Sequence, residues 1–353
     1  MIVIAIITLL LILGLLISVH ELGHFSAAKL SKVRVEEFGL GMFFRIFSFK
    51  RGETTYSLNA LPIGGFVKIT GEDEVVANDP KSFSEKPSSL KILILAAGVT
   101  GNLLLAMVLF SATYLVGMPN WGNRVVIQEV SPDSPALEAG ISVGDVILRA
   151  NETPIEIGSD LSAFNSEHLN ETVALTIERS GQSLTVPVLV RENPPEGQGA
   201  IGVRTTTEVL VTSYEKHDFF GSIKRGFETT VETGEMIGQG LVSLFSDLIT
   251  KRQAPSDVAG PVGIGQIIFE LIKYGYRPIL QFAAILSLNL AFINLIPIPA
   301  LDGGRMLFVI IETITRKKIP SRVNLIVNAT GMGLLLLLMA IITFRDIARL
   351  IGL

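Results

Sequence analysis

The chain opens with the stretch MIVIAIITLLLILGLLISVHELGHFSAAKL, residues 1–30. Its first nineteen residues carry no charged side chain and are long enough to enter a lipid bilayer. The next five read His-Glu-Leu-Gly-His, so ionisable groups stand where lipid is expected, which makes them functional candidates. On a helix, His20 and His24 lie one turn apart on one face and can reach the same metal ion, with Glu21 beside them. The pattern predicts a zinc hydrolase; the alternative is that these groups only join neighbouring helices.

The composition indicates a membrane protein with a soluble portion. Of 353 residues, 48% are hydrophobic and 18% are charged, and the mean hydropathy is +0.51, which is too apolar for an ordinary soluble chain. The net charge of −4 and the lack of a basic tract argue against nucleic acid as a partner. The chain has no cysteine, which excludes disulfides and thiolate zinc ligands.

The hydropathy pattern predicts a polytopic α-helical membrane protein with four transmembrane helices, at residues 1–30, 92–121, 278–304 and 323–344. A cleavable signal peptide is the alternative for the first, but no basic region precedes the apolar run and no small-x-small site follows it before His20. The remaining segments are expected to be a cytoplasmic segment with a membrane-associated β-hairpin (31–91), a β-rich domain (122–206), an amphipathic linker (207–277), a basic cytoplasmic loop (305–322) and a C-terminal tail (345–353).

The distribution of lysine and arginine predicts the orientation of these spans. Basic residues collect after the first span and after the third, and the second group contains no acid. Both loops are therefore expected on the cytoplasmic side, with the N-terminus, the β-rich domain and the C-terminus on the opposite side. The basic residues are Lys32, Arg34, Arg45, Lys50, Arg51 and Lys91 in the first group and Arg316, Lys317, Lys318 and Arg322 in the second.

The end of the third span carries a candidate third metal ligand. It reads Asn294-Leu-Ile-Pro-Ile-Pro-Ala-Leu-Asp302-Gly-Gly. Zinc bound by two histidines needs a third protein ligand and keeps a fourth position for water, and a carboxylate is a common third ligand. Pro297 and Pro299 break the helix and let the backbone bend Asp302 toward the first span, which a membrane tolerates only inside protein or at a polar cavity. An interfacial turn is the alternative for Asp-Gly-Gly.

With these motifs the chain resembles the site-2 proteases of the bacterial regulator-of-sigma-E protease group. That group carries His-Glu-x-x-His in its first span and Asn-x-x-Pro-x-Pro-x-Leu-Asp-Gly-Gly in its third, and the similarity extends to residues 61–68 and 260–264. The resemblance implies an intramembrane zinc metalloprotease of the inner (cytoplasmic) membrane. It also implies that the substrates are single-span membrane proteins, such as anti-sigma factors or signal-peptide remnants. The best-known members have two PDZ modules, whereas this chain has room for one.

The predicted chemistry is hydrolysis of a peptide bond inside the membrane. Zn²⁺ held by His20, His24 and Asp302 would make water more acidic and polarise the scissile carbonyl, while Glu21 would take the water proton and return it to the leaving amine. The resemblance adds Asn294, which matches a family position that contacts the substrate backbone. Hydrogen bonding between helices is the alternative role for Asn294.

A second candidate for substrate binding lies in the segment after the first span. Residues 56–69 alternate in polarity around Pro62, Gly64 and Gly65, which predicts a hairpin with an exposed edge near the site. In the family a comparable β element holds the substrate as an added strand, and this makes Gly64 and Gly65 candidate substrate-binding residues. The alternative is a cytoplasmic hairpin anchored by Phe66.

The segment between the second and third spans is expected to contain a small β-rich domain. Short β-branched runs at 125–130, 146–150, 173–178 and 184–190 alternate with turn residues. The stretch from Ser134 to Ile147 resembles the signature of circularly permuted bacterial PDZ domains, with a peptide groove implied near residues 199–203. Such a domain either binds a peptide or C-terminus by strand addition or acts only as a steric plug.

Other features carry weaker predictions. Apolar residues recur at helical spacing in the linker, which predicts an amphipathic helix that serves as a gate or a brace. His168 and His217 have no second ligand at helical spacing and are expected outside the metal site. The apolar positions of the linker helix are Phe220, Ile223, Phe227, Val231, Ile237, Leu241, Leu244 and Leu248.

Two other classes of protein compete with the protease. A membrane scaffold or receptor could use the PDZ-like domain and keep a non-catalytic metal site, but a closed structural zinc site has no use for a general base such as Glu21. A transporter would be expected to show an inverted repeat, and none is apparent among four spans. The sequence therefore favours the protease.

Overall fold

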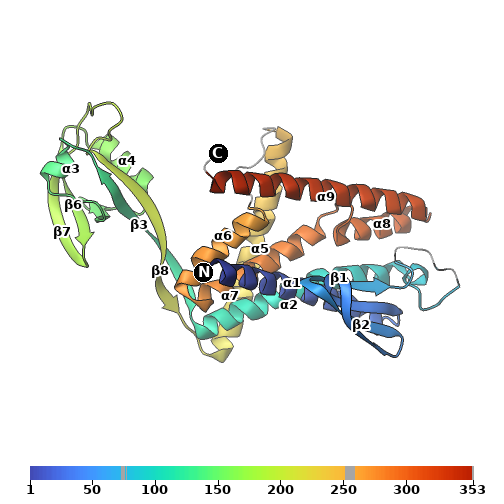
Figure 1. Ribbon diagram of the computed structural model, residues 1–353. Coiled ribbons are helices and arrows are strands. Elements are labelled where there is room, and N and C mark those ends of the chain that lie inside the picture. The colour runs from blue at the N-terminus through green and yellow to red at the C-terminus, as the bar shows by residue number, and fades with distance from the viewer. Residues whose placement is uncertain (73–75, 77, 251–258, 352–353) are drawn as a thin grey trace. The chain divides into compact units, whose positions relative to one another are not determined.

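The computed structural model describes residues 1–72, 76, 78–250 and 259–351 (Figure 1). The chain divides into two compact units. The first combines residues 1–118 with residues 216–353, and the second contains residues 119–215. Each unit has its own hydrophobic core, so each is described separately.

Within the described residues, four helices of the first unit are long and apolar enough to cross a membrane. They are α1 (Ile2–Leu30), α2 (Ser88–Val116), α7 (Tyr276–Leu295) and α9 (Ser321–Leu350). The prediction of a membrane protein with several apolar helices and a β-rich part is confirmed at this level. The second helix begins and ends a few residues earlier than expected, because Gly117 ends it and a strand follows.

The helices α1, α2 and α7 share one core, whereas α9 is largely exposed. Each helix contributes at least one fully buried side chain to that core: Leu16 from α1, Phe110 from α2 and Leu288 from α7. Figure 1 shows α1 lying along α2. Because lipid competes equally well for apolar side chains, such helices associate through close packing and polar contacts.

The third span is not one continuous helix. It ends at Leu295, and α8 begins at Asp302 and continues to Thr315. The expected helix over 278–304 is therefore interrupted, and residues 305–315 of the expected loop are helical. Pro297 and Pro299 interrupt the hydrogen-bonding pattern, and Asp302 stands in the first turn of α8, where a carboxylate is favoured.

The predicted hairpin within residues 56–69 was wrong in its turn. The chain forms β1 (Val35–Arg51) and β2 (Thr54–Ile69), joined at Gly52 and Glu53. Gly52 has a φ of +63°, which a two-residue hairpin loop favours, and this is why the turn lies there. The two strands bend, so that Gly39 lies opposite both Ser57 and Phe66. A short 3-10 helix, η1 (Phe83–Glu85), precedes α2.

The expected linker over 207–277 contains strand and helix. A strand continues to Glu215, and α5 (Phe219–Thr250) follows as the predicted amphipathic helix. Residues 251–258, within the expected linker, lie outside the described part of the chain. Two short elements, α6 (Pro261–Leu271) and η2 (Ile272–Tyr274), lead into α7. The expected C-terminal tail is helical as far as Leu350.

The second unit contains the predicted β-rich domain. A sheet has the strand order β7-β6-β4-β3-β8, with β5 paired to β4. The four predicted runs fall in strands, except that Val190 follows the end of β7. The elements are β3 (Met118–Val130), α3 (Pro135–Glu138), β4 (Val146–Ala150), β5 (Thr153–Pro154), α4 (Gly158–Glu167), β6 (Thr172–Arg179), β7 (Gln182–Leu189) and β8 (Val203–Glu215).

An ion pair between a buried carboxylate and a partly exposed arginine joins the turn before β4 to the end of β6. Asp145 is buried and accepts hydrogen bonds of 2.7 Å from Nε and Nη2 of Arg179 and one of 2.8 Å from the Ser142 backbone. The Arg179 hydrogen bonds, followed by the Ser142 N–H, hold the pKa of Asp145 below its ordinary value. This carboxylate therefore stabilises the folded unit in its charged form.

We predict that Asp145→Asn destabilises the second unit and removes part of its acid sensitivity. Because the folded pKa is depressed, the contribution is fully present above the unfolded pKa of about 3.9 and is lost as pH falls through the folded pKa. The difference in unfolding midpoint between wild type and variant should therefore be largest near neutral pH and shrink below about pH 4. Trp121, the only tryptophan of the chain, lies in β3, so its fluorescence reports the unfolding of this unit.

Glu152→Gln provides the matched control for this measurement. Glu152 also pairs with an arginine, Arg149, but its side chain is 98% exposed. An exposed pair contributes little to stability, so the control should unfold at nearly the wild-type midpoint. A midpoint for Asp145→Asn that equals the wild-type value across this pH range would contradict the assignment.

Candidate active site

Three side chains from two distant parts of the chain meet in the first unit. His20 and His24 lie on α1, and Asp302 is the first residue of α8. The Nε2 atoms of the two histidines are 3.2 Å apart, and Oδ2 of Asp302 lies 3.0 Å from Nε2 of His20 and 3.3 Å from Nε2 of His24. Both imidazoles are buried. The three predicted ligands therefore form one compact triangle.

The triangle fits a tetrahedral zinc ion. Zinc binds nitrogen and oxygen at about 2.0–2.2 Å, which separates neighbouring ligand atoms by roughly 3.3 Å. Within the described residues, this trio is the group of His, Asp and Glu side chains that could hold a metal ion. Oδ2 of Asp302 is buried and accepts no hydrogen bond from the part of the chain that the structure describes, so an acceptor is available for a cation. Two nitrogens and one carboxylate oxygen leave the fourth position open, as in catalytic zinc sites.

Backbone and side-chain contacts with α2 orient both imidazoles. Nδ1 of His24 donates a 2.8 Å hydrogen bond to the carbonyl of Ile94, which leaves Nε2 free to bind a metal. The amide of Asn102, fully buried, lies 3.4 Å from Nδ1 of His20. Its Oδ1 has no hydrogen-bond partner among the described residues, and rotation of the amide would bring this oxygen against a protonated Nδ1. Asn102 can therefore fix the tautomer that directs Nε2 of His20 toward Asp302.

Two glycines allow α1 and α2 to approach closely at this point. A Cβ on Gly23 would lie 2.2 Å from the carbonyl oxygen of Ala97, and a Cβ on Gly98 would lie 2.3 Å from Nε2 of His24. A methyl group fits at neither position. Glycine is therefore required where the two helices cross and where α2 faces the imidazoles.

A polar cavity of about 270 Å³ opens beside the metal-binding triangle. Glu21 and His20 of α1, Asn294 of α7, and Asp302 and Arg305 of α8 line it. Glu21 is only half-buried. The candidate base, two of the three candidate ligands and the candidate backbone contact therefore line one cavity, which has room for water and part of a peptide.

The two glycine candidates of β2 lie next to this cavity. A Cβ on Gly65 would lie 3.5 Å from Cγ of Glu21, and a Cβ on Gly64 would lie 3.9 Å from Cδ1 of Ile17. Gly64 has a φ of +85°, which favours glycine. Although the turn was predicted at the wrong place, this part of β2 does lie beside the candidate base.

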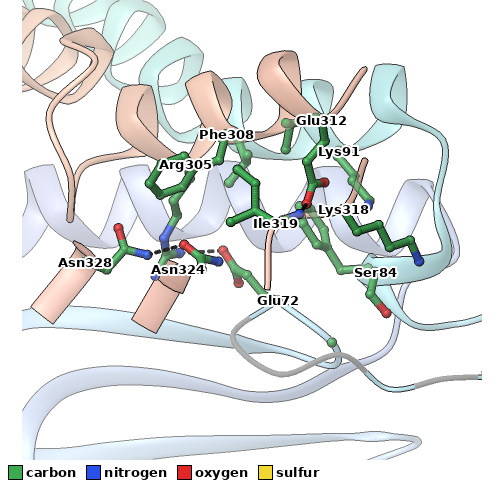
Figure 2. A pocket seen from close by; sticks show the side chains of 14 residues that line it. Glu72, Ser84, Lys91, Arg305, Phe308, Glu312, Lys318, Ile319, Asn324 and Asn328 are labelled. Carbon is green, nitrogen blue, oxygen red and sulfur yellow. Dashed lines mark hydrogen bonds and ion pairs between the residues drawn. The ribbon is translucent and has the colours of Figure 1, made fainter. Parts of the chain in front are cut away.

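An ion pair that was not predicted from the sequence connects the end of β2 to α8. Arg305 donates a 2.5 Å hydrogen bond to Glu72, which follows β2. Figure 2 shows these residues at a second polar cavity, lined also by Asn324 and Asn328 of α9. Arg305 borders both cavities. The sequence contained one sign of this role: Arg305 follows Asp302 by three residues, and this spacing places both side chains on the same face of a helix.

The remaining histidines lie elsewhere, as predicted. His168 stacks on Phe164 in the second unit, and His217 packs against Tyr114 in the first. Neither belongs to the metal-binding group found among the described residues. Asn102 and Gly98 were not predicted, because their role depends on the crossing of two helices.

Comparison with known proteins agrees with this geometry. A model of peptidase family M50 matches residues 8–338. Proteins of Clostridium perfringens and Clostridium acetobutylicum, provisionally named zinc metalloproteases, are 37% and 35% identical to the chain. The first alignment covers 96% of this chain and 97% of the relative, and the second covers 95% and 94%.

A further relative is the zinc metalloprotease RasP of Oceanobacillus iheyensis. It is 27% identical over 426 aligned positions, which cover 98% of this chain and 99% of RasP. Because the alignment is longer than the 353 residues of this chain, RasP carries inserted segments. The match of the family model over most of the length shows that the chain belongs to peptidase family M50, the site-2 protease family.

Proposed function

We propose that this protein hydrolyses a peptide bond within or near the transmembrane segment of single-span membrane proteins. Members of its family are zinc metalloendopeptidases, and the chain is an enzyme of this type. The observation that carries the proposal is the triangle of His20, His24 and Asp302 beside Glu21, within helices suited to a membrane. Membership of a peptidase family leaves no support for the scaffold alternative.

In this proposal His20, His24 and Asp302 hold the zinc ion, and Glu21 moves the proton. The bound ion supplies Lewis acidity, which polarises the scissile carbonyl and makes water more acidic. Glu21 accepts a proton as the water oxygen bonds to the carbonyl carbon, and it delivers that proton to the nitrogen as the C–N bond breaks. Its half-buried position in the cavity wall suits a group that must meet both water and substrate.

The location of the site supports a substrate that spans the membrane. His20, Glu21 and His24 lie within α1, a candidate membrane span, and not in a soluble domain. A transmembrane helix hides its carbonyls in internal hydrogen bonds, so it must unwind before hydrolysis. The polar cavity supplies the environment that an unwound backbone needs.

Asn294 is proposed to contact that unwound backbone. Its side chain lines the cavity. The same cavity is lined by Glu21 and by Asp302. Its place in the wall of the cavity beside the candidate base favours a contact with the substrate over the alternative of hydrogen bonding between helices.

The edge of β2 at Gly64 and Gly65 is proposed to hold the substrate as an added strand. The proximity of Gly65 to Glu21 supports this placement. The partner strand β1 exposes a group of large apolar side chains that is suited to contact with lipid. These side chains are Met42, Phe43, Phe44, Ile46, Phe47 and Phe49.

The second unit is proposed to be a PDZ-like domain that binds a peptide. A cavity of about 270 Å³ lies between α4 and residues 199–203, where the groove was expected. Asn165 of α4 lines it, and its buried Oδ1 has no hydrogen-bond partner in the described structure. An unsatisfied acceptor in a groove favours peptide binding over a steric plug.

The proposed location is the inner (cytoplasmic) membrane, with the active site toward the cytoplasm. The placement of the basic residues supports this orientation. The helix α8 and the residues after it, which carry Arg316, Lys317 and Lys318, would then lie on the cytoplasmic side, and the second unit on the opposite side.

We predict that Glu21→Gln reduces cleavage by about 10²- to 10⁴-fold, the usual contribution of a general base. The amide keeps the shape of the side chain but cannot accept the proton. The measurement is cleavage of a tagged single-span membrane protein in detergent, with zinc content determined in parallel. Zinc content should stay at the wild-type level. Cleavage by the variant at the wild-type rate would refute the role of Glu21.

We predict that Gly98→Ala weakens zinc binding by about tenfold or more, as expected when the orientation of a ligand is disturbed. The added methyl group would collide with the metal-binding nitrogen of His24. Competition with a chelator measures the affinity. Gly333→Ala is the control, because a Cβ on Gly333 meets no atom of the described residues within 4 Å. Equal zinc affinities for the two variants would contradict the close contact.

We predict that Asn294→Leu lowers kcat/KM by roughly 3- to 10-fold, which corresponds to one lost hydrogen bond. Zinc affinity should not change, because Asn294 is not among the metal-binding atoms. A loss of thermal stability with unchanged kcat/KM would instead support a contact between helices.

A further inference from the structure

The backbone that delivers Asp302 to the metal site has an unusual conformation. Two residues earlier, Ala300 has a φ of +76°, in the left-handed region that residues other than glycine seldom adopt. Such a conformation persists only where surrounding groups hold it. The stability of this turn therefore determines where Asp302 points.

A side chain from α9 provides one of these supports. The backbone N–H of Ala300 donates a 3.1 Å hydrogen bond to Oδ1 of Asn328. Nδ2 of Asn328 in turn donates a 2.8 Å bond to Oδ1 of Asn324, one turn earlier on α9. This second bond fixes the orientation of the amide, so that its oxygen faces Ala300. Figure 2 shows the two asparagines side by side at the cavity that Arg305 also borders.

A close backbone contact accompanies this hydrogen bond. A Cβ on Gly331 would lie 2.6 Å from both Cβ and the carbonyl oxygen of Pro299. Gly331 and Asn328 lie about one turn apart on the same face of α9. The helix therefore contacts the turn at two consecutive residues, Pro299 and Ala300.

Asn328 is a polar, hydrogen-bonded residue in a helix that is otherwise mostly apolar. Most of α9 is apolar and exposed, as a helix in lipid would be. Polar side chains are expensive within such a helix and are retained where they have a partner or a function. Asn324 and Asn328 have partners in each other and in the turn that carries Asp302.

We propose that Asn328 is a positioning residue, which holds the Ala300 turn and thereby orients Asp302 toward the two histidines. The inference rests on the proposed function, in which Asp302 is the third zinc ligand. Asn328 does not touch the metal or the substrate; it acts through the backbone two residues before the ligand. The last helix thus completes a site whose ligands all lie on other helices.

The test measures zinc affinity by chelator competition for four variants of the full-length protein in detergent. Asn328→Leu removes the acceptor with little change in size and should weaken zinc binding about 10- to 100-fold. Asn328→Asp retains an oxygen for the Ala300 N–H and should recover part of the affinity. Gly333→Ala, on the same helix, should bind zinc as the wild type does. Asp302→Ala should bind more weakly than the wild type.

Combining Asn328→Leu with Asp302→Ala separates a positioning role from a general defect. If Asn328 acts through Asp302, its substitution should cause no further loss in the Asp302→Ala background. An equal loss in both backgrounds, or wild-type affinity of Asn328→Leu, would overturn the inference. Unchanged affinity of Asp302→Ala would instead refute the third ligand, and therefore the proposed site itself.

Hydrogen exchange provides a second measurement if Asn328→Leu does not fold. Residues 296–301 contain only four backbone amide hydrogens, because Pro297 and Pro299 have none. In the metal-free protein, Asn328→Asp should protect the Ala300 amide nearly as well as Asn328 does, whereas Asn328→Ser, with a shorter side chain, should not. Equal exchange at Ala300 in the wild type and Asn328→Ser would contradict the proposed support.

Discussion

The close approach of α1 to α2 is the contact on which the site depends. Gly23 rests against the backbone of α2, and Gly98 rests against the imidazoles of α1. Only at this separation can His24 reach the carbonyl of Ile94 and can Asn102 reach His20. One crossing of two helices therefore sets both the distance between the ligands and their tautomers. In lipid, where apolar surface gives little preference between partners, small residues make such a crossing specific.

The local part of the site could be predicted from the sequence, because helical spacing alone brings His20 and His24 onto one face. Asp302 lies beside the histidines, where the expected break of the span at the two prolines directed it. The turn of the hairpin was placed wrongly. The prediction relied on the alternation around Pro62, Gly64 and Gly65 within residues 56–69, which does not reveal that the chain already reverses at Gly52.

What escaped prediction depends on contacts between residues distant in the chain. Asn102 and His20 are 82 residues apart, and Arg305 is 233 residues from Glu72. Spacing along one element carries no information about such pairs. The helix α8 was not predicted for a different reason, because Asp302, Gly303 and Gly304 have the composition of a turn. In the structure, the two glycines instead allow the first turn of α8 to pack against the backbone carbonyls of residues 295, 296 and 298.

Polar contacts explain how a largely lipid-facing helix can have a fixed position. Apolar side chains of α9 gain little by leaving lipid for protein, so they do not determine where the helix docks. Its polar contacts lie toward its two ends. Asn328 binds the turn before Asp302, and the buried Asp346 accepts hydrogen bonds of 3.0 and 2.8 Å from the backbone N–H groups of Gly260 and Gly263 at the start of α6. A carboxylate at a helix N-terminus satisfies donors that the helix itself leaves free. Both contacts are with backbone N–H groups, so the position of α9 is tied to the backbone of the elements that surround the site.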